Sequence, residues 1–271
     1  MLKLYSYHNS ICTQKVLITL AEKGQAFTTQ NVDLFRNEQF APWYLAINPK
    51  GVVPALDHDG HVITESSLIC EYLDDVFPTP RLVPADPYLR AKMRLWSKRV
   101  DEHLFEATRE LSFSAMFREK MRGMSEEQRE GRYRNTGDPI KRARLISTYE
   151  LGAESPFVYQ GIGAWELALH AMEQDLATRG GLWLLGEAMT LADINMMPFL
   201  ARLHYLNLLD IWITDRPLVQ AWFARAQALP SFATAITAWL TETDLSAMHL
   251  HGSAIRTPVA AQLAAYRERG S

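Results

Sequence analysis

The spacing of hydrophobic and polar residues changes near residue 80 and divides the chain into two regions. In the first region, short apolar runs typical of strands alternate with runs whose apolar residues recur every three or four positions, as in helices. The turn signal Asp59-Gly60 joins the last two strand patterns as a hairpin. The expected strands cover residues 2–7, 27–34, 55–57 and 61–64, and the expected helices cover residues 12–23 and 66–77. The pattern therefore predicts a small α/β fold near the N-terminus.

Every strong pattern after residue 88 is helical. Apolar residues from Leu89 to Leu111 recur at steps of three or four, which indicates a long amphipathic helix. Residues 78–87 contain four prolines and are typical of a linker. We therefore expect two domains. Residues 1–80 would form a βαβ unit followed by ββα, the thioredoxin-like α/β plan, and residues 88–271 would form an all-α C-terminal domain.

Three features distinguish parts of the helical region. Thr190 and Asp193 have the spacing of a capping box, and the apolar stretch 195–209 that follows predicts a central helix with Pro198 inside it. Residues 118–144 carry nine basic residues against five acidic ones. This segment fits either solvated helices or a lid that attracts anionic groups. The tail from residue 244 is weakly periodic and fits either an extra helix or a frayed end.

Composition and charge exclude several classes of protein. A formal net charge of −3 gives no reason to expect nucleic-acid binding. No apolar run reaches the roughly 20 residues of a membrane span, and the first residues have a strand pattern that does not resemble a signal peptide. Cys12 and Cys70 are the two cysteines, and the scattered histidines show no metal-ligand spacing. We therefore expect a cytoplasmic protein without a disulfide or a metal site.

The start of the first helix carries the clearest candidate chemistry. Ser10 and Cys12 lie between the first strand and this helix, where unpaired N–H groups and the helix dipole favour an anionic sulfur. Cysteine thiols at such positions can have a pKa well below the usual value of about 8.5. The simpler interpretation is a serine N-cap beside a small buried cysteine.

Two further motifs precede the second helix. Val53-Pro54 leads directly into a strand, and a cis peptide bond there would turn the Val53 backbone toward a ligand. Glu65-Ser66 opens the helix, where the two side chains suit an amine and a carboxylate respectively. An ordinary trans proline and a helix cap are the simpler interpretations.

In their order and spacing, these segments resemble the N-terminal domain of the glutathione transferase family, and the similarity extends over nearly the whole chain. The resemblance implies a cleft between two domains that binds glutathione as co-substrate. It assigns the sulfur to Ser10 or Cys12, the backbone clamp to Val53 and Pro54, and the γ-glutamyl group to Glu65 and Ser66. It also implies that Gln39 and Lys50 reach the glycyl carboxylate, and that the protein is a homodimer or a heterodimer with a paralogue.

Two subgroups of the family compete for the second substrate. The opening residues 1–6 and the runs 54–66 and 69–73 look like bacterial glutathione-dependent β-etherases, which cleave lignin-derived aryl ethers. Residues 10–12 and the runs 200–203 and 212–217 look like tetrachlorohydroquinone dehalogenases, in which a cysteine attacks a glutathionyl intermediate. The first resemblance implies β-aryl ether cleavage, and the second implies reductive dehalogenation or thiol transfer through Cys12. A non-catalytic interaction module is a third interpretation.

An aromatic second substrate needs an apolar pocket lined with aromatic side chains. The candidate lining residues are Tyr7, Phe113, Met116, Phe117, Tyr159 and Trp165. Core packing is the simpler role for each of them. The nucleophile in either subgroup is the glutathione sulfur, and ether cleavage additionally requires a donor for the departing phenolate.

Overall fold

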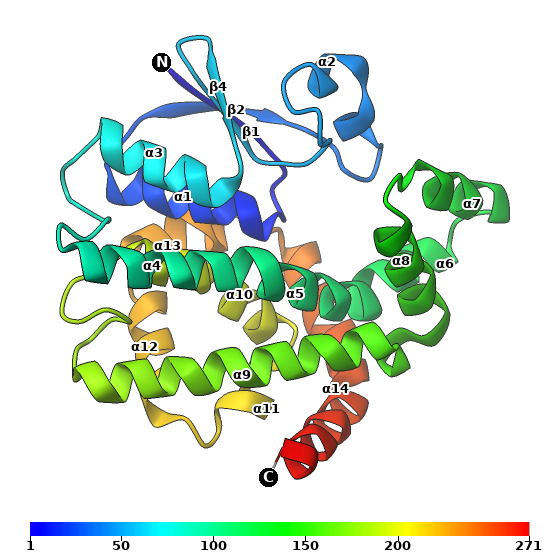
Figure 1. Ribbon diagram of the computed structural model, residues 1–271. Coiled ribbons are helices and arrows are strands. Elements are labelled where there is room, and N and C mark those ends of the chain that lie inside the picture. Colours follow the sequence, from blue (N-terminus) through cyan, green and yellow to red (C-terminus); the bar gives the residue numbers. More distant parts are fainter. Residues whose placement is uncertain (271) are drawn as a thin grey trace. The chain divides into compact units, whose positions relative to one another are not determined.

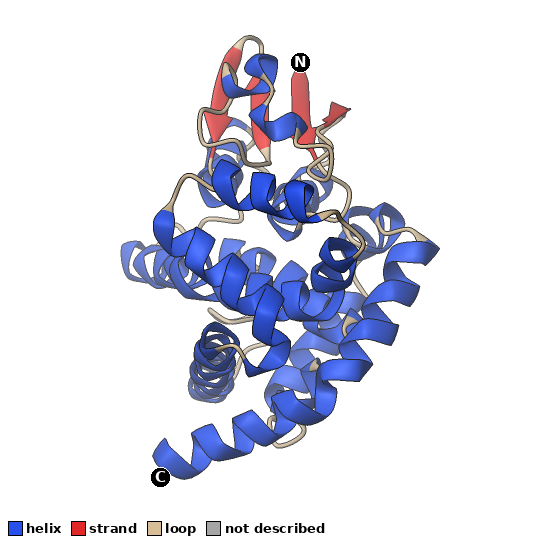
Figure 2. Ribbon diagram, turned by 90° about the vertical axis from the view of Figure 1, so that its right-hand side faces the viewer, coloured by secondary structure: helices blue, strands red, loops and turns tan. Residues whose placement is uncertain are grey.

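The computed structural model describes residues 1–270 of the chain. A four-stranded sheet and four short helical elements form the N-terminal part, and helices follow (Figures 1 and 2). The elements of the N-terminal part are β1 (Leu2–Ser6), α1 (Ile11–Glu22), β2 (Phe27–Asn31), the 3₁₀ helix η1 (Glu38–Phe40), α2 (Pro42–Leu45), β3 (Ala55–His58), β4 (His61–Thr64) and α3 (Ser66–Val76).

The named elements after α3 are all helical. They are α4 (Pro87–Arg99), the π-helix η2 (Val100–Leu104), α5 (Phe105–Ser112), the π-helix η3 (Phe113–Phe117), α6 (Arg118–Arg122), α7 (Glu126–Asn135), α8 (Pro139–Leu151), η4 (Gly152–Glu154), α9 (Pro156–Arg179), α10 (Leu191–Tyr205), α11 (Leu209–Ile213), α12 (Pro217–Gln227), α13 (Pro230–Ala235), η5 (Thr237–Trp239) and α14 (Glu242–Gly270). Within residues 1–270 the only pairing outside the sheet is an isolated bridge, so the expected thioredoxin-like α/β plus all-α fold class is confirmed.

The sheet has the strand order β2-β1-β3-β4. Strand β1 is parallel to β2, with Leu2 opposite Phe27, and antiparallel to β3. The β3–β4 hairpin turns at Asp59 and Gly60, whose φ angles are 52° and 88°. Two-residue hairpin loops favour positive φ at both positions because their twist then matches that of the strands. The hairpin expected from the Asp59-Gly60 signal is therefore present.

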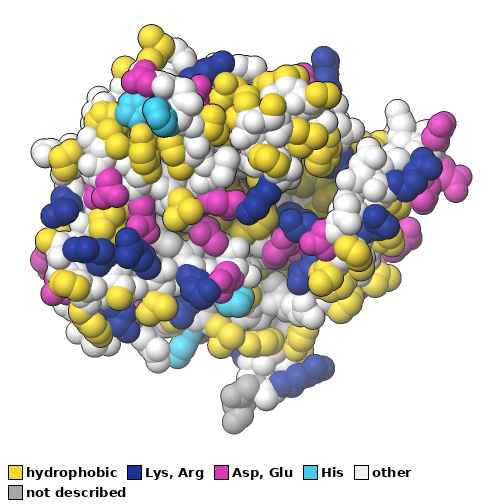
Figure 3. All heavy atoms as spheres, turned by 45° about the horizontal axis from the view of Figure 1, so that its top comes forward, with side chains coloured by type: hydrophobic (Ala, Val, Ile, Leu, Met, Phe, Trp, Pro, Cys, Tyr) yellow, Lys and Arg dark blue, Asp and Glu magenta, His cyan; other side chains and the backbone are white. Residues whose placement is uncertain are grey.

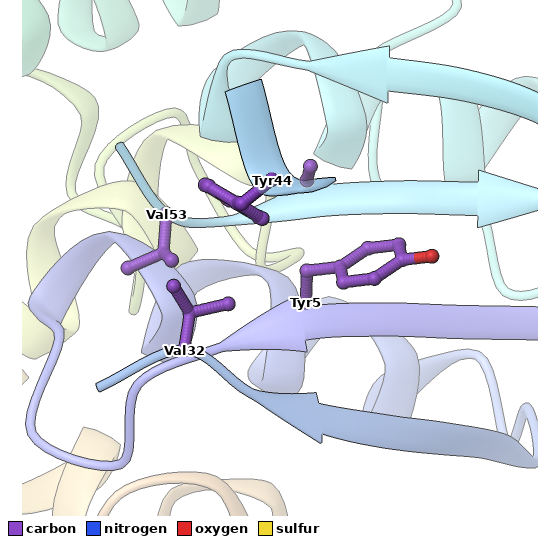
Figure 4. Packing of buried hydrophobic residues seen from close by; sticks show 5 residues of the cluster. Tyr5, Val32, Tyr44 and Val53 are labelled. Carbon is purple, nitrogen blue, oxygen red and sulfur yellow. The ribbon is translucent and has the colours of Figure 1, made fainter. Parts of the chain in front are cut away.

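One apolar cluster joins the sheet to the chain around it. Tyr5 comes from β1, Val32 follows β2, Tyr44 comes from α2, and Val53 precedes β3. Figure 4 shows Val32 and Val53 facing each other across the ends of their strands. Because these side chains are buried together, the cluster fixes the backbone that leads into β3.

A buried ion pair ties the proline-rich stretch to the helices α1 and α3, which pack side by side (Figure 1). The Lys23 ammonium, just after α1, contacts the Asp74 carboxylate of α3 and also donates to the Pro80 carbonyl. The same carboxylate accepts hydrogen bonds from the backbone N–H groups of Leu82 and Val83, at 2.7 and 3.1 Å. A buried pair needs such additional partners, because both charges lose their hydration.

The long helical stretch after the linker follows the predicted pattern. Met93, Trp96, Val100, Leu104 and Leu111 are all buried, as their spacing predicts. Two π-helical segments, η2 and η3, interrupt the α-helical hydrogen bonding of this stretch. Such segments are rare, and they occur frequently at functional sites.

The capping box at the start of α10 is also present. The Thr190 hydroxyl accepts from the N–H of Ala192 at 3.3 Å, and the Asp193 carboxylate accepts from the Thr190 N–H at 2.9 Å. Asp193 is fully buried and also accepts from the Trp222 indole N–H at 2.9 Å. Its role is therefore structural, as expected, and Pro198 lies inside the helix.

The C-terminal tail forms the 29-residue helix α14, which decides between the two expectations for this segment. A Cβ placed on Gly252 would lie 1.9 Å from the Leu206 carbonyl oxygen, so α14 needs a glycine where it crosses the end of α10. Arg267 of α14 and Arg216 share the Glu166 carboxylate of α9. These contacts fasten the tail to the helices beneath it.

The described chain groups into two compact units. The first contains Met1–Lys98, Asp175–Pro198 and Ala221–Thr241, and the second contains Arg99–Gln174, Phe199–Gln220 and the residues from Glu242 onward. Basic and acidic side chains are interspersed on the face shown in Figure 3. Across residues 1–270, the structure has no helix that is both long and apolar enough to cross a membrane.

Candidate active site

Ser10 is the N-cap of α1, as predicted. Its Oγ accepts a hydrogen bond from the Thr13 N–H at 3.3 Å, and its φ and ψ angles of −90° and 117° are extended. The hydroxyl proton is not used in this cap, so Ser10 can still donate to a bound anion. The side chain is half-buried, which leaves it accessible to a ligand.

Cys12 and Thr13 follow in the first turn of the same helix. Cys12 is half-buried, and neither it nor Cys70 forms a disulfide bond. Thr13 is fully buried, and its hydroxyl has no hydrogen-bond partner within residues 1–270. The helix start therefore brings two hydroxyls and one thiol to the positive end of the helix dipole.

Two hydrogen bonds to the same backbone carbonyl oxygen hold the loop before β3. The Tyr44 hydroxyl and the Asn48 side-chain amide each donate to the Val52 carbonyl oxygen, both at 2.7 Å. Burial raises the pKa of Tyr44 far above its usual value, so the hydroxyl remains a donor. The Val53–Pro54 peptide bond that follows is cis, as the sequence analysis anticipates.

Gly51 permits this loop to turn. Its φ is +60°, and a Cβ at this position would lie 2.9 Å from the Phe40 ring. Any other residue would meet both a backbone and a steric penalty. The turn therefore depends on glycine at the residue between Lys50 and Val52.

Glu65 and Ser66 stand at the start of α3. Glu65 has a φ of 68° and a ψ of 110°, an unusual conformation for a residue other than glycine, and such conformations cluster at ligand-binding sites. The Glu65 carboxylate lies 2.6 Å from the Lys50 ammonium, and both side chains are exposed. Ser66 is the first residue of α3 and is largely buried.

Gln39 lies in η1 and is buried apart from 8% of its surface. Its side-chain carbonyl oxygen has no hydrogen-bond partner in the described part of the chain. A buried polar atom without a partner is costly unless a ligand or water pairs with it. Gln39 is therefore suited to contact a polar ligand.

The residues predicted to bind glutathione all belong to the first unit. They supply hydroxyl groups at the start of α1 and, as an ion pair, the Lys50 ammonium and the Glu65 carboxylate. These groups complement a molecule that carries a thiol, carboxylates and an amine, so the residues present fit glutathione. No cluster of three or more His, Cys, Asp or Glu side chains in residues 1–270 is placed to hold a metal ion.

The predicted substrate-pocket residues are distributed over both units. Tyr7, in the first unit, packs against the cluster around Tyr44. In the second unit, the structure brings Phe113 and Phe117 into one cluster, and Met116 is buried in the same π-helix.

Two other candidates for this pocket lie on α9. The ring of Tyr159 is 6.1 Å from that of Tyr266, on α14. Trp165 is fully buried, and its indole N–H has no partner within the described residues. Neither residue belongs to the cluster that contains Phe113.

Comparisons with known proteins identify the family. The family model "Glutathione S-transferase, N-terminal domain" matches residues 9–76, and "Glutathione S-transferase, C-terminal domain" matches residues 156–225. Maleylacetoacetate isomerase of Pseudomonas aeruginosa is 31% identical over 86% of this chain and 95% of its own length. The chain belongs to the glutathione S-transferase family. It is accordingly a transferase, and glutathione is its co-substrate.

Two comparisons point to one relative of this glutathione transferase. Protein LigF of Sphingobium sp. strain SYK-6 is 54% identical over 104 residues, which span 38% of this chain and 40% of LigF. The crystal structure of the β-etherase LigF from that strain matches with a TM-score of 0.76 and 31% identity, over 88% of this chain and 99% of the LigF chain. The sequence similarity is thus concentrated in one part of the chain, while the fold is shared along most of it.

Sequence reasoning missed several groups that support the site. Tyr44 was not among the candidates, although it and Asn48 hold the Val52 carbonyl. Lys15 is fully buried in α1 and donates to the Ser67 hydroxyl of α3 at 2.6 Å. The Lys15–Ser67 contact joins residues far apart in the chain. The bonds from Tyr44 and Asn48 to Val52 are local but lie in a loop without helix or strand periodicity, so the hydrophobic pattern did not reveal them.

Proposed function

We propose that this glutathione transferase cleaves β-aryl ethers. The observation that carries the proposal is the local 54% identity to LigF, together with the match along most of the chain to the LigF structure, a β-etherase. The Ser10 hydroxyl supports the proposal, because at the start of α1 it retains a proton that it can donate to a thiolate.

In this reaction the glutathione thiol first loses its proton. Ser10 stabilises the thiolate by a hydrogen bond, aided by the dipole of α1. Glu65 and Ser66 hold the γ-glutamyl group, Lys50 and Gln39 the glycyl carboxylate, and the backbone at Val53 the cysteinyl group. The sulfur then attacks the carbon that carries the aryloxy group. A carbon–sulfur bond forms as the carbon–oxygen bond breaks, and the departing phenolate takes up a proton.

The test is incubation of the protein with glutathione and each stereoisomer of a model β-aryl ether. We expect one molecule of phenol to be released for each glutathione consumed. Chromatography measures the amount of phenol released. Absence of release above the uncatalysed rate with both stereoisomers would contradict ether cleavage.

The second candidate is thiol chemistry at Cys12, which its place in the first turn of α1 favours. A glutathionyl arene formed by loss of chloride would be attacked at sulfur by the Cys12 thiolate, which releases the reduced arene. A second glutathione would then resolve the resulting mixed disulfide and form oxidised glutathione. Conversion of a chlorinated hydroquinone with two glutathiones consumed per turnover distinguishes this reaction from ether cleavage.

Isomerisation is a third candidate because the match to maleylacetoacetate isomerase covers 86% of the chain. In an isomerisation the sulfur would add to a double bond and leave again. Glutathione would therefore not be consumed. The number of glutathione molecules used per turnover separates all three reactions.

A further inference from the structure

Helix α1 begins with a run of buried polar side chains. Thr13, Gln14 and Lys15 follow one another in the sequence, and at most 2% of the surface of each is exposed. Lysine is almost never fully buried unless its ammonium group has a partner. Here the Lys15 ammonium donates a hydrogen bond to the Ser67 hydroxyl of α3 at 2.6 Å. The first unit therefore holds an ammonium group at a position where an apolar side chain of similar length would be easier to bury.

Two contacts show that α1 and α3 run in the same direction. Lys15 meets Ser67 near the starts of the two helices, and Lys23 meets Asp74 near their ends. The helices lie side by side, so both N-termini are at the same end of the pair (Figure 1). Each N-terminus carries unpaired N–H groups and a partial positive charge. Two helix dipoles therefore add to the charge of Lys15 at this end.

The side chain of Lys15 brings its charge toward these helix starts. Side chains on an α-helix lean toward its N-terminus, and Ser67 is the second residue of α3. The ammonium group thus lies beside the first turn of α3 and close to the first turn of α1. Ser10 caps α1, and Ser66 begins α3. These are the two residues to which the proposed function assigns the thiolate and the γ-glutamyl group.

Other charged side chains on or near α1 and α3 form pairs of opposite sign. The pairs are Lys50 with Glu65, Glu71 with Arg94, and Lys23 with Asp74. Each pair is neutral as a whole, so its field weakens quickly with distance. The titratable side chains nearest the two helix starts are His8, Cys12 and Cys70. An experiment on a bound thiol must therefore separate its signal from theirs.

We infer that the buried Lys15 ammonium, together with the parallel N-termini of α1 and α3, holds the sulfur of bound glutathione in its thiolate form. Lys15 is fully buried, so it acts through its electric field and does not touch the ligand. It is therefore a positioning residue, whereas the proposal places Ser10 against the sulfur. This inference rests on the proposed glutathione site, and it concerns only how the bound thiol loses its proton.

The test measures ionisation of bound glutathione without a second substrate, so its failure is separate from failure of ether cleavage. A thiolate absorbs ultraviolet light more strongly than a thiol, and a pH titration of this absorbance gives the pKa of the bound sulfur. The complex with S-methylglutathione, which has no thiol, is the reference that removes the protein's own signal. For Lys15→Met we expect the pKa of the sulfur to rise by roughly one unit, as for unit charges about 10 Å apart in a protein.

Ser67→Ala is the matched control, because it removes the hydrogen bond between the helices and leaves the ammonium group in place. The pKa of the bound sulfur should not change in this variant, even if its unfolding midpoint falls. Lys15→Met should unfold at the wild-type temperature or above it, because an apolar side chain is easier to bury. If Lys15→Met does not fold, Lys15→Gln gives the same measurement, since glutamine is neutral and can still donate to Ser67.

Steady-state kinetics provide a second measurement. In Lys15→Met the acidic limb of the kcat/KM profile should move to higher pH, and kcat/KM should approach the wild-type value at high pH, where the thiolate forms without help. Three results would overturn the inference: a wild-type complex in which the thiol keeps its solution pKa, a neutral variant of Lys15 with the wild-type pKa, or an equal rise in Ser67→Ala. The last two would leave Lys15 only the structural role of joining α1 to α3.

Discussion

The Ser10 hydroxyl performs two tasks with one oxygen, because it caps α1 and can donate its proton to sulfur. We predict that Ser10→Ala lowers kcat/KM by roughly 10- to 100-fold, as expected for loss of a hydrogen bond to a charged group worth about 1.5–3 kcal/mol. The same change should cost about 1 kcal/mol of stability through the lost cap. Ser10→Thr keeps both functions and is the control. Steady-state kinetics and thermal unfolding separate the two effects.

Cys12→Ser should retain activity in ether cleavage, since glutathione supplies the only attacking sulfur. If Cys12→Ser is inactive while Ser10→Ala is active, the covalent reaction through Cys12 replaces ether cleavage as the best proposal. If both variants remain active, the buried Thr13 hydroxyl becomes the next candidate to hold the sulfur.

Lys50 and Glu65 pair with each other, although each is expected to bind an opposite charge of glutathione. Exposed pairs of this kind contribute about 0–1 kcal/mol, so glutathione can displace one. We predict that Lys50→Met weakens glutathione binding and reduces its salt dependence, while kcat at saturation is retained. Titration calorimetry at two salt concentrations measures this. Lys141→Met, an exposed lysine of α8, should bind glutathione like the wild type.

The sequence predicts the roles of some site residues but not of others. Ser10 was predictable as an N-cap because the signal lies within three residues of the N–H that it accepts from. The positive φ of Glu65 and the grip of Tyr44 on the Val52 carbonyl were not predictable. Neither changes the hydrophobic periodicity: the Tyr44–Val52 bond ends in an irregular loop, and Glu65 is a single residue with an unusual backbone conformation.

At the scale of elements, α14 depends on Gly252. We predict that Gly252→Ala destabilises the protein by about 1–3 kcal/mol or more, because the new Cβ would overlap the Leu206 carbonyl. Gly131→Ala in α7 is the matched control, since no atom lies within 4 Å of a Cβ placed there. That change should stabilise by up to about 1 kcal/mol through helix propensity. Chemical unfolding of both variants checks the contrast.

The Arg256–Asp210 pair fastens α14 to α11 and gives a pH dependence. The hydrogen bonds from Arg256 lower the pKa of Asp210 below its usual value of 3.8. The pair therefore stabilises the fold above about pH 4, and this contribution is lost as pH falls through the lowered pKa. We predict that Asp210→Asn unfolds at a lower temperature than the wild type at pH 7. The difference should shrink at pH 3, and an unchanged difference would contradict the assignment.

Elements with strong local signals were predictable, and those set by tertiary contacts were not. The helix expected at 12–23 is α1 (Ile11–Glu22), and the capping box at Thr190 is present. Strand β2 ends at Asn31, earlier than predicted, because the Asp33 carboxylate accepts from the backbone N–H groups of Phe35 and Arg36 and turns the chain. The π-helices could not be predicted, since they preserve the three-to-four spacing of buried positions.

At the scale of the molecule, we propose that two copies associate. The Glu71–Arg94 ion pair, at 2.8 Å, joins α3 to α4, and Leu68 and Leu95 beside it are more than half exposed. We predict that sedimentation gives twice the chain mass of 30.8 kDa, and that Leu68→Glu shifts the protein toward monomer. Leu250→Glu, on the exposed side of α14, is the control. A monomeric wild type would contradict the proposal, and a paralogue would then be the partner to test.

The division into domains at residues 80–88 stays a prediction. The composition of the linker suggested it, and the compact units interleave segments from several parts of the chain. A change of periodicity marks where the kind of secondary structure changes. It carries no information about which later helices pack with the N-terminal residues, because that depends on contacts at long sequence separation.

A proline-rich connection between two domains is usually where proteases cut first. Here the Asp74 carboxylate accepts hydrogen bonds from the backbone N–H groups of Leu82 and Val83, and Lys23 donates to the Pro80 carbonyl, so the backbone between Pro80 and Val83 is bound within the fold. A protease cleaves a segment that is extended and detached from the fold. These hydrogen bonds keep the backbone attached. The peptide bonds between residues 80 and 83 should therefore resist limited digestion until the first unit unfolds. A fragment ending at residue 80 would lose two donors to Asp74 and should fold poorly on its own.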